Sequence, residues 1–272
     1  MTSLNQQLKT LYESKWDAFA KALKDSGAKV AYPFLLSTNK YENGKDTPSE
    51  KWYTDADIKV MVFGQEPNKW MADDESVKEG DFTSKKQFYA GSQPESVECV
   101  MGIYENQYSI YNFDETGRIL YFQKNNNTFP NLGCNNFTSQ LYEKLSNKII
   151  ACIWNDISKL ATTDGKPIKS DVHNIEKEHF NVIPLEIELL KPDVIVFLTG
   201  CESNYIIEKY PNVIFEPVCE EYRVEDVAKV CGIPNVKFAY RTWHPGAYYK
   251  SGKPYYRYVE SIVADVIKNF RL

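Results

Sequence analysis

The sequence has few of the residues that build metal centres and disulfide frameworks. It contains three histidines and six cysteines in 272 residues. No two cysteines form a Cys-x-x-Cys pair, and no histidine stands at zinc-ligand spacing from a cysteine. Because structural zinc and iron–sulfur sites depend on such spacings, and a chain this long rarely relies on disulfides, we expect none of them. Cys152 falls within a strand-like run and is expected to be a small core residue.

Long apolar runs and an excess of basic residues are also missing. No run of about eighteen apolar residues occurs, so no membrane-spanning helix is expected. Residues 1–7 have neither the basic start nor the apolar core of a secretory signal. We therefore expect a cytoplasmic protein without membrane contact. The net charge of −5 argues against a protein that packages nucleic acid, because phosphate neutralisation requires basic residues. An acidic enzyme that meets nucleic acid through one local basic patch is compatible with this charge.

Strand-like apolar runs alternate with amphipathic segments along most of the chain. We expect strands at 58–63, 148–154, 193–198 and 236–241, an edge strand near 213–215, and helices at 4–26, 138–148, 174–190, 202–210 and 255–270. This alternation predicts an α/β fold, a three-layer α/β/α sandwich with a mainly parallel central sheet of about four strands. The chain has no internal repeat and no Pro/Gly-rich linker, so residues 1–272 are expected to form a single domain.

One long polar segment, residues 71–136, interrupts this pattern. It lacks strong periodicity apart from β-like pieces near 107–113 and 118–123. We interpret it as an insertion that folds over the sheet edge as a lid or a small β-hairpin, since a structureless loop of this length is uncommon in a compact domain.

Three chemically capable side chains follow three of the expected strands. Glu66 lies in the turn after the first strand, Asn155 at the end of the second, and His244 in the turn after the last. Ligands of open α/β sheets bind at the carboxyl ends of the strands. Each residue alone could be a helix cap or an ordinary turn residue. Together, a carboxylate, an amide and an imidazole could activate water, read hydrogen-bonding edges and stabilise negative charge.

The segments around these residues resemble the motifs of the uracil-DNA glycosylase superfamily. Residues 64–68, Gly-Gln-Glu-Pro-Asn, resemble a first motif of the form Gly-Gln-Asp-Pro-Tyr. Residues 149–159 are similar to the apolar strand that ends in the asparagine reading the uracil edge. Residues 186–200 resemble the following helix–strand unit, and 244–246, His-Pro-Gly, resemble the His-Pro-Ser loop. The resemblance runs from about residue 30 to the C-terminus, without most of the insertion.

This resemblance implies a uracil-DNA glycosylase-like fold and cleavage of the N-glycosidic bond of uracil, or of a related damaged base, in DNA. His244 would donate a hydrogen bond to the base carbonyl, and Glu66 would orient a water and offset the positive charge of the sugar. Gln65, Asn68 and Asn155 would bind the base. Such a reaction requires no metal and no organic cofactor.

Several positions differ from the family pattern. Glu66 stands in place of Asp, Asn68 in place of a Tyr that excludes thymine, and Gly246 in place of a phosphate-binding Ser. No single residue matches the aromatic that stacks on the base in the family, although Phe82, Phe88 and Tyr89 lie in the corresponding region. The preferred base is therefore left open.

The segment after His244 mixes cations with tyrosines. Lys250, Lys253 and Arg257 lie among five tyrosines, of which Tyr248 falls where the family inserts a wedge into the duplex. Cations can contact phosphate and aromatic rings can stack on bases, so we expect a local contact with single- or double-stranded DNA, made by a monomer. The alternative is that these tyrosines begin the last helix and pack against the sheet.

Two other functions fit the same residues. The chain could be a non-catalytic nucleic-acid-binding module that has kept the fold and lost turnover, which the acidic charge and the altered motifs favour. It could also be a hydrolase that acts on a free nucleoside or another small ligand beneath residues 71–136.

Overall fold

The computed structural model describes residues 2–28, 30–39, 48–67, 96–102, 137, 140–141, 143–145, 148–161, 168–201, 212–244 and 255–270. The chain divides into two compact units, each made of segments that are distant in the sequence. We call Lys51–Gln65, Tyr111–Asn155 and Lys191–Leu272 the sheet unit, and Met1–Glu50, Glu66–Ile110 and Asp156–Leu190 the helical unit. The expectation of a single domain stays a prediction.

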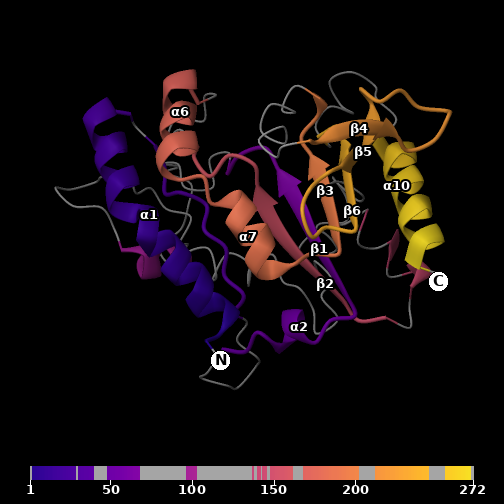
Figure 1. The fold of residues 1–272 in the computed structure, drawn as a ribbon, viewed down its shortest axis with the longest axis horizontal. Coiled ribbons are helices and arrows are strands. Elements are labelled where there is room, and N and C mark those ends of the chain that lie inside the picture. The colour runs from indigo at the N-terminus through magenta and orange to yellow at the C-terminus, as the bar shows by residue number, and fades with distance from the viewer. Residues whose placement is uncertain are drawn as a thin grey trace, which may run out of the picture. The chain divides into compact units, whose positions relative to one another are not determined.

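The sheet has six strands in the order β2-β1-β3-β6-β5-β4. The strands are β1 (Ile58–Gly64), β2 (Ile150–Asp156), β3 (Val194–Leu198), β4 (Ile214–Pro217), β5 (Val227–Cys231) and β6 (Phe238–Thr242). Strand β3 is parallel to β1 and to β6, whereas β5 runs antiparallel to β6 and β4 antiparallel to β5 (Figure 1). The α/β class and the mainly parallel sheet are thus confirmed. The expected count of about four strands was too low.

The two additional strands extend the sheet beyond β6. Strand β4 is the edge strand expected near 213–215, but β5 was not predicted. Val227 and Ala228 are both buried, so β5 lacks the alternation that marks a strand in the sequence. Gly232 follows β5 with φ of 97°, and a Cβ there would lie 2.5 Å from the Asn212 carbonyl oxygen. Only glycine fits this position, because the chain before β4 passes directly against it.

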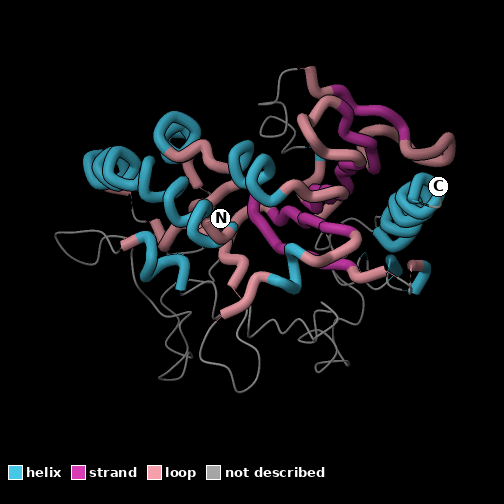
Figure 2. The backbone as a smooth tube through the Cα atoms, turned by 60° about the horizontal axis from the view of Figure 1, so that its bottom comes forward, coloured by secondary structure: helices cyan, strands magenta, loops and turns pink. Residues whose placement is uncertain are grey.

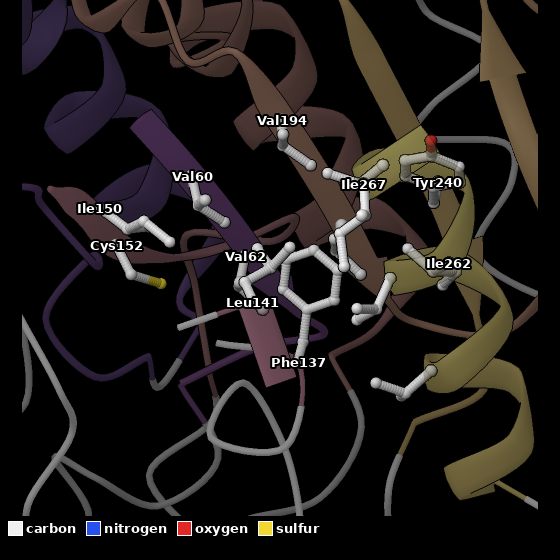
Figure 3. Close-up of a cluster of buried hydrophobic side chains, with 14 of the residues drawn as sticks. Val60, Val62, Phe137, Leu141, Ile150, Cys152, Val194, Tyr240, Ile262 and Ile267 are labelled. Carbon is white, nitrogen blue, oxygen red and sulfur yellow. The ribbon is translucent and has the colours of Figure 1, made fainter. Parts of the chain in front are cut away.

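One face of the sheet packs against the C-terminal helix α10 (Tyr255–Phe270), which runs alongside the strands in Figure 2. This confirms the helix expected at 255–270. Figure 3 shows the cluster between them, which includes Val60, Val62 and Val194 of the strands and Ile262 and Ile267 of α10. Cys152 is 1% exposed within this cluster, which confirms it as a core residue.

A polar contact fixes the helix on the sheet. The Asp265 carboxylate of α10 accepts hydrogen bonds from Lys229 Nζ at 2.8 Å and from the Tyr240 hydroxyl at 2.7 Å. Since apolar packing alone is non-directional, these bonds set the rotation of α10 against β5 and β6.

The opposite face of the sheet is equally apolar. Met61, Phe63, Ile195 and Phe197 are buried there, and the rings of Phe63 and Phe197 stack with centroids 4.8 Å apart. Burial on both faces is typical of parallel strands. The three-layer, glycosylase-like arrangement stays a prediction.

The helical unit begins with α1 (Leu4–Ser26), which confirms the helix expected at 4–26. Ser3 caps its first turn by accepting from Gln6 N–H, and the Glu50 carboxylate accepts from the N–H groups of Leu4 and Asn5. These acceptors satisfy amides that have no partner within the helix. Gly27 ends the helix in the left-handed conformation, with φ of 67°.

The single helix expected at 174–190 was wrong, because the structure has two helices there. Helix α6 (Ser170–His179) and helix α7 (Ile183–Leu190) are separated at Phe180, and both pack against α1 (Figure 1). Pro184 has no N–H to donate back to the Phe180 carbonyl, so the hydrogen-bond ladder cannot continue. The Phe180 ring stacks on Phe19 with centroids 4.4 Å apart.

The remaining expectations are met only in part. Residues 137, 140–141 and 143–144 are helical, as expected for 138–148, and a short helix, α2 (Lys51–Thr54), precedes β1. Residues 202–210 and the β-like pieces at 107–113 and 118–123 lie outside the described residues. Within the insertion, residues 97–102 are helical. Among the described helices, none combines the length and the apolar character needed to cross a membrane.

Candidate functional site

The carboxyl ends of β1, β3 and β6 meet at one edge of the sheet unit. Their parallel register aligns Phe63 with Phe197, and Leu198 with Thr242. The turns that follow the strands are tied to one another. Gln65 Nε2 donates to the Thr199 carbonyl at 3.0 Å, and Gly200 N–H donates to the Thr242 carbonyl at 2.9 Å. The predicted base-binding residue Gln65 therefore has a structural bond at this edge.

His244 lies two residues beyond the end of β6 and is exposed. The residue before it, Trp243, is partly buried against the sheet core, and its indole N–H donates to Asp226 Oδ1 at 3.0 Å. The imidazole is thus presented to solvent at the carboxyl edge from an anchored backbone. Ligands of open α/β sheets bind at this edge.

Asn155 lies inside β2, because the strand extends to Asp156 rather than ending at 154 as expected. The side chain is fully buried, and its Nδ2 donates a weak hydrogen bond to Met61 Sδ at 3.7 Å. Asn155 therefore stands one residue before the end of the strand that neighbours β1. To pair with a base, its amide would have to exchange the thioether contact for the base edge.

Glu66 is half-buried in the turn that follows β1. Burial raises the pKa of its carboxyl group, and the described part of the chain offers it no cationic partner. Glu66 belongs to the helical unit, so the structure does not bring it together with His244 and Asn155 in one described site. Their convergence stays a prediction.

Because the pKa of Glu66 is raised in the folded protein, we expect the difference in stability between the parent and Glu66→Gln to depend on pH. The folded protein holds a proton on this carboxyl at pH values where the unfolded chain has lost it. Stability is therefore lost as the pH rises from the ordinary pKa of 4.5 through the higher folded-state value. We expect Glu66→Gln to be more stable than the parent near neutral pH, and the difference to vanish well below pH 4.5. Urea unfolding at a series of pH values measures this.

Glu188→Gln is the matched control, because Glu188 is an exposed carboxylate of the same unit. It should give no stability gain at neutral pH. A Glu66→Gln variant less stable than the parent near neutral pH would contradict the expectation.

The predicted nucleic-acid contacts fall mostly outside the described residues. Asn68, Tyr248, Lys250, Lys253, Phe82, Phe88 and Tyr89 all lie there. Arg257 is exposed on the first turn of α10. Tyr258 is 4% exposed and packs edge-to-face on Tyr222, with ring centroids 5.0 Å apart. For this tyrosine the structure agrees with the alternative expectation, packing within the fold rather than contact with DNA.

Two polar residues beside His244 were missed by sequence reasoning. Arg241 is 1% exposed at the end of β6, and its N–H groups donate to the carbonyls of Val224 and Glu225. Burial lowers the pKa of this guanidinium. Asp226 is 8% exposed and bonds Trp243. A charged residue ending an apolar strand could have indicated Arg241, but no sequence signal links Asp226 to Trp243.

The described residues were also searched for metal ligands. Within them, no three His, Cys, Asp or Glu side chains gather closely enough to hold a metal ion. Comparison of the chain with protein-family models, with curated proteins and with solved structures finds no match.

Proposed function

We propose that this protein is a DNA glycosylase-like hydrolase, which cleaves the N-glycosidic bond of uracil or of a related damaged base in DNA. The observation that carries the proposal is the exposed His244, which follows the anchored end of β6 at the carboxyl edge of a mainly parallel sheet. The proposal includes a cytoplasmic monomer that meets DNA through a local contact.

Each candidate side chain has a chemical task in this reaction. Breaking the bond leaves an oxocarbenium-like sugar and an anionic base. His244 would donate to the base oxygen on which negative charge grows. Glu66 would orient the attacking water and offset the positive charge of the sugar. Because a base inside a duplex is unreachable, the enzyme would act on single strands or on a base flipped out of the stack.

The amide of Asn155 suits the recognition of uracil. Its oxygen and its N–H₂ group can pair with the adjacent N–H and carbonyl of the base. Cytosine would leave mismatched donors and acceptors, at about 1–3 kcal/mol for each buried group left unpaired.

Release of free uracil from an oligonucleotide tests the proposal. The substrate is single-stranded DNA with one uracil, and the products are free base and an abasic site. We expect the parent to release uracil, and Glu66→Gln to lower turnover more than DNA affinity. Parallel arms with hypoxanthine, with a mismatch and with free uridine identify the substrate.

Two outcomes would replace the proposal with another function. Binding of the oligonucleotide without release, unchanged in Glu66→Gln, would indicate a non-catalytic module. Turnover of uridine but not of the oligonucleotide would indicate a hydrolase of small ligands.

A further inference from the structure

The end of β6 is held by an unusual concentration of side-chain hydrogen bonds. Three consecutive residues, Arg241, Thr242 and Trp243, donate to one turn between β4 and β5. Arg241 donates to the carbonyls of Val224 and Glu225. Thr242 Oγ1 donates to the Asp226 carbonyl at 3.2 Å, and Trp243 Nε1 donates to the Asp226 carboxylate at 3.0 Å. We call residues 223–226 the anchor turn.

The anchor turn is itself internally bonded. The N–H groups of Asp226 and Val227 both donate to the Arg223 carbonyl, at 3.0 and 3.1 Å. Asp226 Oδ2 accepts from Arg223 Nε at 3.1 Å, an ion pair whose arginine side chain is 70% exposed. The Asp226 carboxylate therefore accepts from the Trp243 indole with one oxygen and from Arg223, within the anchor turn, with the other.

These bonds all come from the anchor turn. On the other side, Gly200 N–H donates to the Thr242 carbonyl from the end of β3. The backbone entering His244 is thus fixed between β3 and the anchor turn. Thr242 is fully buried and Arg241 nearly so, whereas His244 is exposed. This arrangement fixes the backbone that enters the exposed His244.

We propose that Asp226 is a positioning residue for His244. Through its bond to the Trp243 indole, it sets the direction in which the imidazole leaves the sheet edge. The inference rests on the proposed function for its effect on catalysis, but the restraint on the backbone that enters His244 is a property of the fold. A catalytic donor misplaced by about 1 Å can lose a hundredfold in rate, so such a restraint has a kinetic consequence.

Two variants remove the bond from its two ends. Trp243→Phe keeps an aromatic ring against the core but loses the indole N–H together with part of the ring volume. Asp226→Ala loses the acceptor. Asp226→Asn keeps an acceptor oxygen of the same reach and is the conservative rescue. Glu220→Gln removes an exposed carboxylate from the same β4–β5 loop and serves as the matched control.

The first readout needs no catalysis. The imidazole signals of His244 in a two-dimensional NMR spectrum are assigned by their loss in His244→Ala. We expect them to shift or broaden in Trp243→Phe and in Asp226→Ala, to return close to the parent position in Asp226→Asn, and to stay unchanged in Glu220→Gln. Dispersed amide signals elsewhere show that each variant is folded.

The second readout is kinetic. We expect kcat for uracil release to fall about tenfold in Trp243→Phe and in Asp226→Ala, with KM for the oligonucleotide changing less than about twofold. Asp226→Asn should recover most of the rate. A merely stabilising bond would lower the unfolding midpoint and leave kcat unchanged.

The outcomes separate the inference from the proposed function. If the parent releases no base while the imidazole signals shift as expected, the proposed function fails and the positioning role stands. If those signals are unchanged in Trp243→Phe, which is the milder variant, the positioning role is overturned even if Asp226→Ala fails to fold. Unchanged kcat in folded variants of an active parent overturns the kinetic role of Asp226.

Discussion

Replacement of His244 by alanine is expected to lower the rate of uracil release at least about a hundredfold. One donor to a developing negative charge is worth about 2.7–4 kcal/mol in the transition state, because the donor is fixed before the charge develops. His244 follows the anchored end of β6 at the carboxyl edge, so its loss should remove this stabilisation. Single-turnover release of uracil from single-stranded DNA measures the effect.

The chain offers two matched controls for this variant. His173 and His179 are the other two histidines, and both lie on α6 in the helical unit. Alanine at either position should leave the rate close to that of the parent. A His244→Ala variant that releases base at the parent rate would remove this residue from the site.

Loss of either partner of the buried Lys159–Glu186 ion pair is expected to destabilise the protein by about 3–5 kcal/mol. The two side chains are fully buried in the helical unit, with Lys159 Nζ 2.9 Å from Glu186 Oε1. The Tyr12 hydroxyl donates to the same carboxylate oxygen at 2.6 Å and accepts from Leu36 N–H at 3.1 Å. Each single change, Lys159→Met or Glu186→Gln, leaves one charge buried without its counterion.

The double variant Lys159→Met/Glu186→Gln removes both charges and keeps an acceptor for Tyr12. We expect it to lose much less stability than the two single variants combined, because no uncompensated charge remains. Urea unfolding of the four proteins gives the coupling free energy. Strictly additive losses of stability, or losses below about 1 kcal/mol in the single variants, would contradict the expectation that each buried charge depends on its partner.

A surface ion pair of the same unit provides the comparison. On α1, Lys21 Nζ lies 2.6 Å from Asp25 Oδ2, but the two side chains are 77% and 61% exposed. Lys21→Met should change the free energy of unfolding far less than Lys159→Met, because water screens the charges and ordering two long side chains costs entropy. The contrast between the two pairs isolates the effect of burial.

The local sequence pattern was sufficient to predict the elements whose structure depends mainly on their own residues. The apolar run at 58–63 becomes β1, and the amphipathic segments at 4–26 and 255–270 become α1 and α10. Such patterns are readable because burial follows the period of a strand or a helix within a few residues. The same reasoning placed Gln65 and His244 at strand ends, since a turn must follow each strand.

The sequence alone also determined which residue types were present to form a site, and the order along the chain of the strands that carry them. The tertiary structure decided what surrounds those residues. The Phe180 ring stacks on Phe19 of α1. Arg241 and Trp243 donate hydrogen bonds to acceptors on the anchor turn. Lys159 forms a buried ion pair with Glu186. These contacts join residues far apart in the chain, and their free energy exists only once the fold has brought the partners together.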